Sequence, residues 1–202
     1  KYPNWYDSYQ DKGYDVEAES VAFGALWAGT ETRDYTSPRF GGMPAYEGFF
    51  LQRWLASLKA VDGGSVTFGG GWYDTLDSHP ASYIEQARQT VLGGRGESFL
   101  FNYGLLRNLN HQPSPNGADC ARALKAEMPA LQAVATELKR AGRRAVGIHA
   151  YKPANSHSGC VADPAHPSAG CGGGVSELHV FDFVGFLGFP LVPVAECPSA
   201  SD

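Results

Sequence analysis

The stretch SVTFGGGWYDTLDSHPASYIEQARQTVLGGRGESFLFNYG, residues 65–104, predicts a strand, a helix and a second strand in succession. The first strand runs into three glycines, where the backbone can turn sharply or approach a ligand. The helix has a proline near its start, two glycines at its end and one apolar face made by Ile84, Ala87 and Val91. A strand, helix and strand in this order are typical of a parallel sheet covered by helices, the α/β class.

The residues on either side of this stretch repeat the pattern. VAFGALWAG (21–29) predicts a strand, and PAYEGFFLQRWLASLKA (44–60) predicts a helix. The apolar stripe of that helix consists of Phe50, Leu51, Trp54, Leu55 and Leu58. We therefore expect at least three strands separated by helices.

The later part of the chain continues the alternation. GADCARALKAEMPALQAVATELKRAG (117–142) predicts two helical pieces, because Pro129 lacks a backbone donor and can open a second helix. The stripe of that second piece consists of Leu131, Val134, Ala135 and Leu138. RAVGIHAYKP and PLVPVAE predict strands, and SELHVFDFVGFLGF between them predicts a helix.

Composition and charge exclude several classes of protein. Of the 202 residues 43% are hydrophobic and 12% aromatic, which indicates a packed chain and not a disordered one. The formal charge of -5 is spread without a block of like charge, so we expect no nucleic-acid partner. The longest apolar stretch, 184–195, is short and interrupted by proline, so we expect a soluble protein without a membrane partner.

Polar and aromatic residues gather where the first three predicted strands end. The three ends read Thr30-Glu31-Thr32-Arg33-Asp34, then Gly71-Trp72-Tyr73-Asp74, then Asn102-Tyr103. The carboxyl ends of parallel strands share one face, where α/β proteins bind their ligands. Aromatic rings stack on sugars, and two carboxylates can act on a glycosidic bond. The alternative is structural: Arg33 pairs locally with Glu31 or Asp34, and the aromatic residues cap the core.

The four cysteines leave three interpretations open. Cys160 and Cys171 flank the loop CVADPAHPSAGC, where a disulfide would staple a flexible segment and indicate an oxidising, extracytoplasmic compartment. Free thiols are an equal alternative. A zinc site built with His157 and His166 matches none of the compact zinc spacings, so we expect no metal.

The segment SYIEQARQTVLGGRGESFLFNYG resembles the last helix and strand of a glycoside hydrolase (β/α)8 barrel, similar to the β-galactosidase-like group of family 42. In that group an amidotransferase-like domain follows the barrel, and RAVGIHAYKPANS with ELHVFDFVGFLGFPLVPVAE looks like its opening. The resemblance implies a partial (β/α)8 barrel in residues 1–142 and the first β-α-β of a flavodoxin-like domain in residues 143–202. On this resemblance, the first three predicted strands correspond to barrel strands six, seven and eight.

The resemblance also implies roles for individual residues. Relatives of this kind carry an acid/base Glu after strand four and a nucleophilic Glu at the end of strand seven, where this chain has Gly69, Gly70 and Gly71. Only Glu31 and Asp74 could substitute as the catalytic carboxylates. Arg33, Trp72, Asn102 and Tyr103 would then bind the sugar.

Two functions follow from the resemblance and the strand ends. The first is a carbohydrate-active barrel enzyme that needs no cofactor, of which this chain is a fragment that would be inactive alone. The alternative is a non-catalytic carbohydrate-binding or interaction protein that keeps the pocket. The amidotransferase-like domain would serve in packing or in forming a homo-oligomer, since the sequence contains no G-x-C-x-G nucleophile elbow.

Overall fold

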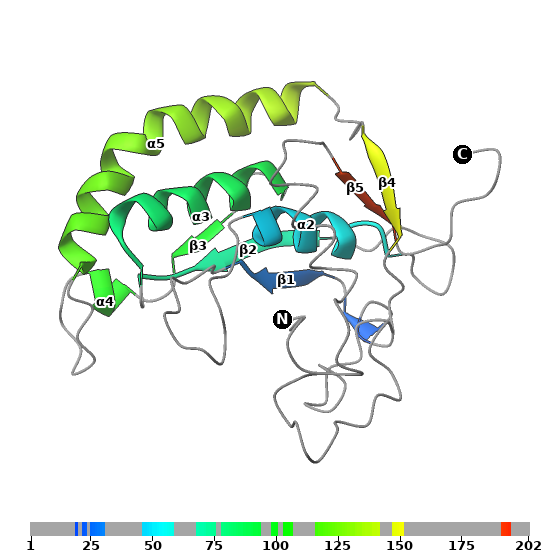
Figure 1. The fold of residues 1–202 in the computed structure, drawn as a ribbon, viewed down its shortest axis with the longest axis horizontal. Coiled ribbons are helices and arrows are strands. Elements are labelled where there is room, and N and C mark those ends of the chain that lie inside the picture. The colour runs from blue at the N-terminus through cyan, green and yellow to red at the C-terminus, as the bar shows by residue number, and fades with distance from the viewer. Residues whose placement is uncertain are drawn as a thin grey trace, which may run out of the picture. The chain divides into compact units, whose positions relative to one another are not determined.

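Strands and helices alternate in the first part of the described chain, as Figure 1 shows. The computed structural model describes residues 19, 22–23, 25–30, 46–58, 68–75, 78–93, 98–100, 103–106, 116–141, 147–151 and 191–194. These residues form β1 (Leu26–Gly29), α2 (Tyr46–Leu55), β2 (Phe68–Tyr73), α3 (Pro80–Gly93), β3 (Ser98–Leu100), α4 (Tyr103–Leu106), α5 (Gly117–Arg140), β4 (Ile148–Tyr151) and β5 (Leu191–Val194).

The chain divides into two compact units. The first, which we call the sheet unit, comprises residues 27–52 and 69–144, and the second comprises residues 1–26, 53–68 and 145–202. The second unit contains the parallel pair β4–β5, in which Ile148 lies opposite Leu191 and Tyr151 opposite Val194. The predicted helix SELHVFDFVGFLGF between these strands lies outside the described residues.

The three strands β1, β2 and β3 form a sheet in the order of the sequence. β2 and β3 are parallel, with Gly71 opposite Ser98 and Tyr73 opposite Leu100. Each pair of neighbouring strands is separated in sequence by a helix, so the strand–helix–strand prediction made from residues 65–104 is confirmed. The class of the fold is α/β.

The apolar stripes predicted for α2 and α3 are confirmed. The predicted residues on α2 are at most 1% exposed: Phe50, Leu51, Trp54 and Leu55. Leu58, the last residue of the predicted stripe, lies three positions after the end of α2 and is 4% exposed. In α3 the three stripe residues Ile84, Ala87 and Val91 are also buried, and Pro80 occupies the first helical position. Helical periodicity located both buried faces because each stripe repeats every three or four residues.

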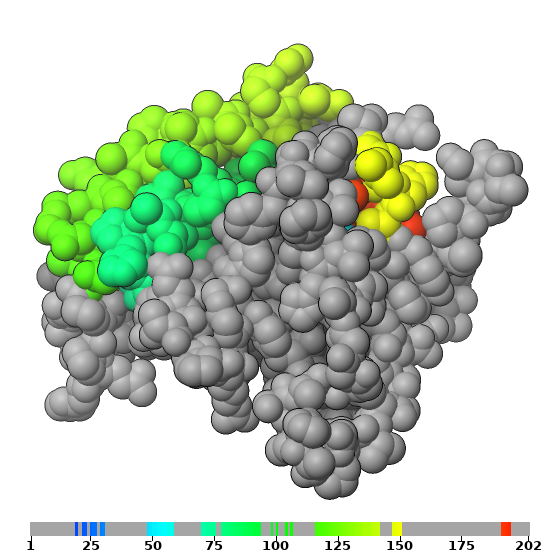
Figure 2. All heavy atoms as spheres, viewed as in Figure 1, coloured from blue at the N-terminus to red at the C-terminus, as the bar shows by residue number. Residues whose placement is uncertain are grey.

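α3 and α5 pack against each other and lie side by side in the space-filling view (Figure 2). Their core cluster joins Tyr73 of β2 and Tyr83, Ile84 and Ala87 of α3 to side chains of α5. Those side chains are Cys120, Leu124 and Leu131. At the edge of this interface Arg88 Nε lies 2.9 Å from Glu127 Oε1, which links the two helices at the surface.

The prediction that Pro129 divides α5 into two helices is wrong. α5 is one helix of 24 residues with Pro129 in its interior, and Figure 1 shows it bending along its length. Leu124 and Leu131, on either side of the proline, are both buried in the same cluster. A proline inside a helix costs about 3 kcal/mol, and packing on both sides of it offsets that cost.

Two further sequence predictions differ from the structure. Val134, expected in the buried stripe of α5, is 37% exposed, because the face runs through Leu131 and Ala135 and leaves Val134 at its edge. Tyr103, expected at the end of the third strand, begins the short helix α4 instead. β3 itself is only Ser98–Leu100.

Candidate functional site

The carboxyl ends of β1 and β2 meet at Thr30 and Trp72. The backbone N–H of Thr30 donates to the carbonyl oxygen of Trp72 at 2.8 Å, and Thr30 Oγ1 lies 3.0 Å from the same oxygen. Thr30 directly follows β1, and Trp72 is the second-last residue of β2. The residues that continue from both strands therefore start from the same edge of the sheet.

A buried threonine pair fixes this junction to the helix layer. Thr30 Oγ1 lies 2.6 Å from Thr90 Oγ1 of α3, and Thr90 Oγ1 lies 2.7 Å from the carbonyl oxygen of Gln86. Both threonines are at most 2% exposed. The two carbonyl oxygens can only accept, and each hydroxyl has one proton, so at any moment two of these three short contacts are hydrogen bonds. Thr30 is therefore a structural residue.

Two glycines of β2 permit this close approach. A Cβ added to Gly71 would lie 2.6 Å from Thr30 Cγ2 and 3.2 Å from Thr90 Cγ2, so only glycine fits between the two threonines. The preceding residue, Gly70, has a φ of 144°, which side-chain-bearing residues rarely adopt. The glycine run was predicted to make a sharp turn or to approach a ligand. At Gly71 it instead lets the strand pack closely against α3.

Asp74 follows β2 directly and is fully buried, at 0% exposure. Burial raises the pKa of Tyr83, and the charges of Tyr73, Cys120 and Asp74 add to that rise. The Tyr83 hydroxyl is itself buried, and the described residues give it no hydrogen-bond partner.

The turn after Asp74 is anchored to both helices. Gln86 Nε2 of α3 donates to Ser78 Oγ at 2.9 Å, and Asn116 Nδ2, just before α5, donates to the Ser78 carbonyl oxygen at 3.2 Å. The backbone N–H of Ser78 donates to the carbonyl oxygen of Thr75 at 3.4 Å. These bonds tie Ser78, four positions after Asp74, to α3 and to the residue before α5.

Trp72 and Tyr73 point to opposite faces of the sheet, because side chains alternate along a strand. The Tyr73 ring packs on Tyr83 of α3, with 5.2 Å between ring centroids and 59° between ring planes. Tyr73 is thus on the helix-covered face, and Trp72, which is partly exposed, is on the other. Of the predicted sugar-binding aromatics, Trp72 has the orientation expected of a strand-end site.

The structure brings only part of the predicted site into view. Asp74 and Trp72 are described, and Tyr103 is described as the first residue of α4. The other predicted residues lie outside the described residues: Glu31, Arg33, Asn102, Cys160 and Cys171. Their roles remain predictions, as does the division into domains at residues 142 and 143.

Three polar side chains that support the strand ends were not predicted from the sequence. Tyr83, Gln86 and Thr90 are fully buried on α3. Their positions in the sequence are three, four and seven apart, the spacing of one helix face, and they adjoin the predicted apolar stripe. The helical spacing of these three residues was the sequence signal for this buried face. It is missed when only apolar residues are used to find the buried face of a helix.

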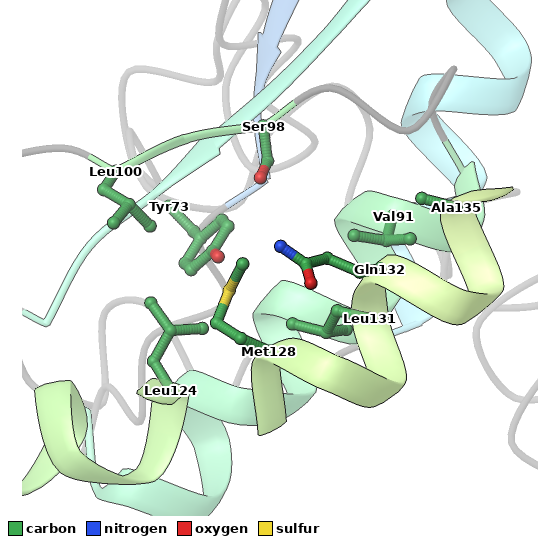
Figure 3. Close-up of a pocket in the computed structure, with 9 residues that line it drawn as sticks. All are labelled: Tyr73, Val91, Ser98, Leu100, Leu124, Met128, Leu131, Gln132 and Ala135. Carbon is green, nitrogen blue, oxygen red and sulfur yellow. The ribbon is translucent and has the colours of Figure 1, made fainter. Parts of the chain in front are cut away.

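The described part of the chain also contains a cavity of about 220 Å³ on the helix-covered face. Its walls come from β2, β3, α3 and α5, and they include Tyr73, Ser98, Leu124, Leu131 and Gln132 (Figure 3). Because Tyr73 lines it and Trp72 points the other way, this cavity is separate from the predicted sugar site.

Within the described residues, no three His, Cys, Asp or Glu side chains lie close enough together to hold a metal ion. In that same part of the chain, no helix combines the length and the apolar character needed to cross a membrane.

Comparison with known protein families identifies the family of this chain. Residues 1–145 match the family model described as "Probable glycosyl hydrolase, catalytic domain". This range includes β1, β2 and β3, the helices between them and α5. No curated protein and no solved structure matches the chain.

Proposed function

Since the chain belongs to the family described as probable glycosyl hydrolase catalytic domains, we propose that it hydrolyses glycosidic bonds at the carboxyl ends of β1 and β2. The observation that carries this proposal is the contact between Thr30 and Trp72, which brings those two strand ends together. Glu31 is the next residue after Thr30, and Asp74 is the second residue after Trp72. Two carboxylic acids thus follow directly from two joined strand ends.

We assign the acid/base and nucleophilic work to Glu31 and Asp74. Hydrolysis of a glycosidic bond needs one carboxyl group to protonate the leaving oxygen and a second to attack the sugar or to activate water. Asp74 directly follows β2 and is fully buried, so its carboxyl group is held within the fold at the strand end. The bonds of Ser78 to α3 and to Asn116 support the chain four positions after Asp74, and catalytic groups need such support.

Trp72 is the proposed stacking platform for the sugar. It is next to Tyr73 in β2, points to the face away from the helices and is only partly buried. Aromatic faces bind the apolar faces of sugar rings, so a ring at this position can orient the substrate relative to Asp74. Arg33, Asn102 and Tyr103 are proposed to bind sugar hydroxyl groups beside it.

The finer proposal is a β-galactosidase-like enzyme of (β/α)8 architecture. The sequential strand order β1-β2-β3 with intervening helices supports it, because successive units of such a barrel are adjacent in the sheet. The parallel pair β4–β5 supports the proposal of a separate amidotransferase-like domain after residue 142. A disulfide between Cys160 and Cys171 would place this protein outside the cytoplasm.

The decisive experiment measures hydrolysis of a panel of aryl glycosides by the full-length gene product and its variants. We expect Asp74→Asn and Glu31→Gln each to lower kcat/KM at least about 100-fold, the usual contribution of acid/base catalysis. The matched control is Glu137→Gln, which removes a carboxylate that pairs with Arg140 on the surface of α5 and should leave kcat/KM unchanged. Thermal unfolding of each variant establishes that the fold is retained.

The outcomes separate the enzyme from the binding protein. Full activity in both variants would contradict the proposed carboxylates. Sugar binding without hydrolysis, lost in Trp72→Ala and retained in Asp74→Asn, would replace the enzyme by a carbohydrate-binding protein. If the wild type neither binds nor hydrolyses any glycoside of the panel, the proposed function is wrong.

A further inference from the structure

We propose that the cavity between β3 and α5 binds a small, uncharged aromatic alcohol of about one ring. This cavity lies on the face of the sheet that carries Tyr73, so it is not the sugar site. Binding there does not depend on glycoside hydrolysis.

The first argument is size. The cavity holds about 220 Å³, which is below the usual range of about 300–1,000 Å³ for drug-sized ligands. Apolar cavities of about 150 Å³ are known to bind benzene. The space therefore suits a single ring with one or two substituents.

The second argument is the chemistry of the walls. Leu124 and Leu131 of α5 and Val91 of α3 are buried and form an apolar floor. Met128, 37% exposed, and Leu100, 44% exposed, lie at the rim. Such walls favour a ligand that buries apolar surface, and the sulfur of Met128 adds favourable contacts with an aromatic ring.

The third argument is the position of the polar groups. Tyr73, Ser98 and Gln132 direct their polar atoms into the same part of the cavity (Figure 3). A side-chain hydrogen bond joins Tyr73 to Ser98, and burial raises the pKa of Tyr73 to about 12, so its hydroxyl keeps its proton at neutral pH. Hydroxyl and amide groups both donate and accept hydrogen bonds, which matches a ligand hydroxyl group.

The fourth argument is the absence of charge. None of the described residues that line the cavity is ionisable near neutral pH. The described walls offer an ionised ligand no opposite charge to offset the hydration that it would lose on entering. The ligand is therefore neutral, and p-cresol combines the size, the ring and the hydroxyl group that the cavity selects.

Isothermal titration of the full-length protein with p-cresol, toluene and benzoate tests the proposal. We expect p-cresol to bind one site with a Kd between about 10 µM and 1 mM, as small ligands of this size do. Toluene lacks the hydroxyl group and cannot form the hydrogen bonds that p-cresol forms with the polar cluster, so it should bind at least about tenfold more weakly. Benzoate, which is ionised at pH 7, should give no measurable binding.

Two variants on one helix locate the site. Ala135→Phe places a ring in the cavity and should abolish p-cresol binding. Ala133→Phe, the matched control on the exposed side of α5, should leave it unchanged. If Ala135→Phe does not fold, Ser98→Ala combined with Gln132→Leu serves instead, and it should make p-cresol bind no better than toluene.

Several results would overturn the proposal. Absence of saturable p-cresol binding would exclude the ligand, and equal binding of p-cresol and toluene would exclude the role of the polar cluster. Tight binding of benzoate would contradict the uncharged cavity. A dimer seen by sedimentation in the wild type and lost in Ala135→Phe would show that a second copy of the chain covers this site instead.

Discussion

Gly71 of β2 and Thr30 after β1 are so close that a Cβ on Gly71 would lie 2.6 Å from Thr30 Cγ2. Real Cβ atoms essentially never make such contacts, and Thr90 of α3 closes the other side at 3.2 Å. The glycine therefore sets the distance between two strands and a helix at the point where the proposed site begins.

Gly71→Ala should lower the free energy of unfolding by about 1–3 kcal/mol, the usual cost of overfilling a packed core. The added methyl group must push Thr30 or Thr90 aside. Chemical denaturation measures the effect. Thr30→Ser removes Cγ2, so the double variant should recover part of the loss. If Gly71→Ala and the double variant lower the free energy of unfolding equally, the methyl group at position 71 does not meet Thr30 Cγ2.

Thr90→Val should lower the free energy of unfolding by about 1–2 kcal/mol. Valine keeps the shape of the side chain but removes the hydroxyl group that lies 2.6 Å from Thr30 Oγ1. The control is Thr136→Val, whose hydroxyl bonds to the Gln132 carbonyl on the exposed face of α5. The control should change stability by less than about 0.5 kcal/mol. Similar effects of the two changes would argue against the threonine pair.

Pro129→Ala should raise the free energy of unfolding by about 1–3 kcal/mol. The proline is exposed inside the continuous helix α5, so alanine restores a backbone donor without disturbing the core. Thermal unfolding and helical circular dichroism report the change. Ala130→Gly, the companion change one residue later, should cost about 1 kcal/mol if α5 is helical there. Destabilisation by Pro129→Ala would show that the helix is interrupted at this point.

Stability should fall as the pH rises from about 9 to about 12. Burial raises the pKa of Cys120 from 9.0 to about 11 and that of Tyr73 from 10.0 to about 12, and it also raises the pKa of Tyr83. The folded protein thus keeps protons that the unfolded chain releases. The stabilisation is complete below pH 9. Between the unfolded and the folded pKa of each group, the free energy of unfolding falls by about 1.4 kcal/mol per pH unit.

Denaturation midpoints measured between pH 8 and 12 test this slope. In Cys120→Ala the free energy of unfolding should no longer begin to fall near pH 9. The fall at higher pH, which is due to the tyrosines, should remain. A constant free energy of unfolding over this range would show that these groups are not buried.

Sequence reasoning located the elements of the sheet unit well. Ile84, Ala87 and Val91 repeat at helix spacing with a proline before them and glycines after them, and these local signals fix the extent and buried face of α3. Pro129 misled the analysis because its local penalty is outweighed by Leu124 and Leu131 packing on either side of it. That packing depends on α3, which is distant in sequence.

The site was predicted less completely than the fold. The sequence placed Asp74 and Trp72 at the end of a strand, and they do lie there. It did not distinguish Thr30, which is a buried link between strand and helix, from the charged residues after it. The bonds of Thr30 to Trp72 and Thr90 span 42 and 60 positions of the chain, and a contact at that range leaves no periodic signal.

The separation between the Glu31 and Asp74 carboxyl groups, measured in a crystal structure of the full-length protein with a bound glycoside, tests the central claim most directly. Joined strand ends predict that both groups face the glycosidic oxygen, about 5 Å apart if the reaction retains the sugar configuration and about 6.5–9.5 Å apart if it inverts it. Carboxyl groups on opposite faces of the sheet, or a glycoside bound away from both, would contradict the proposed site.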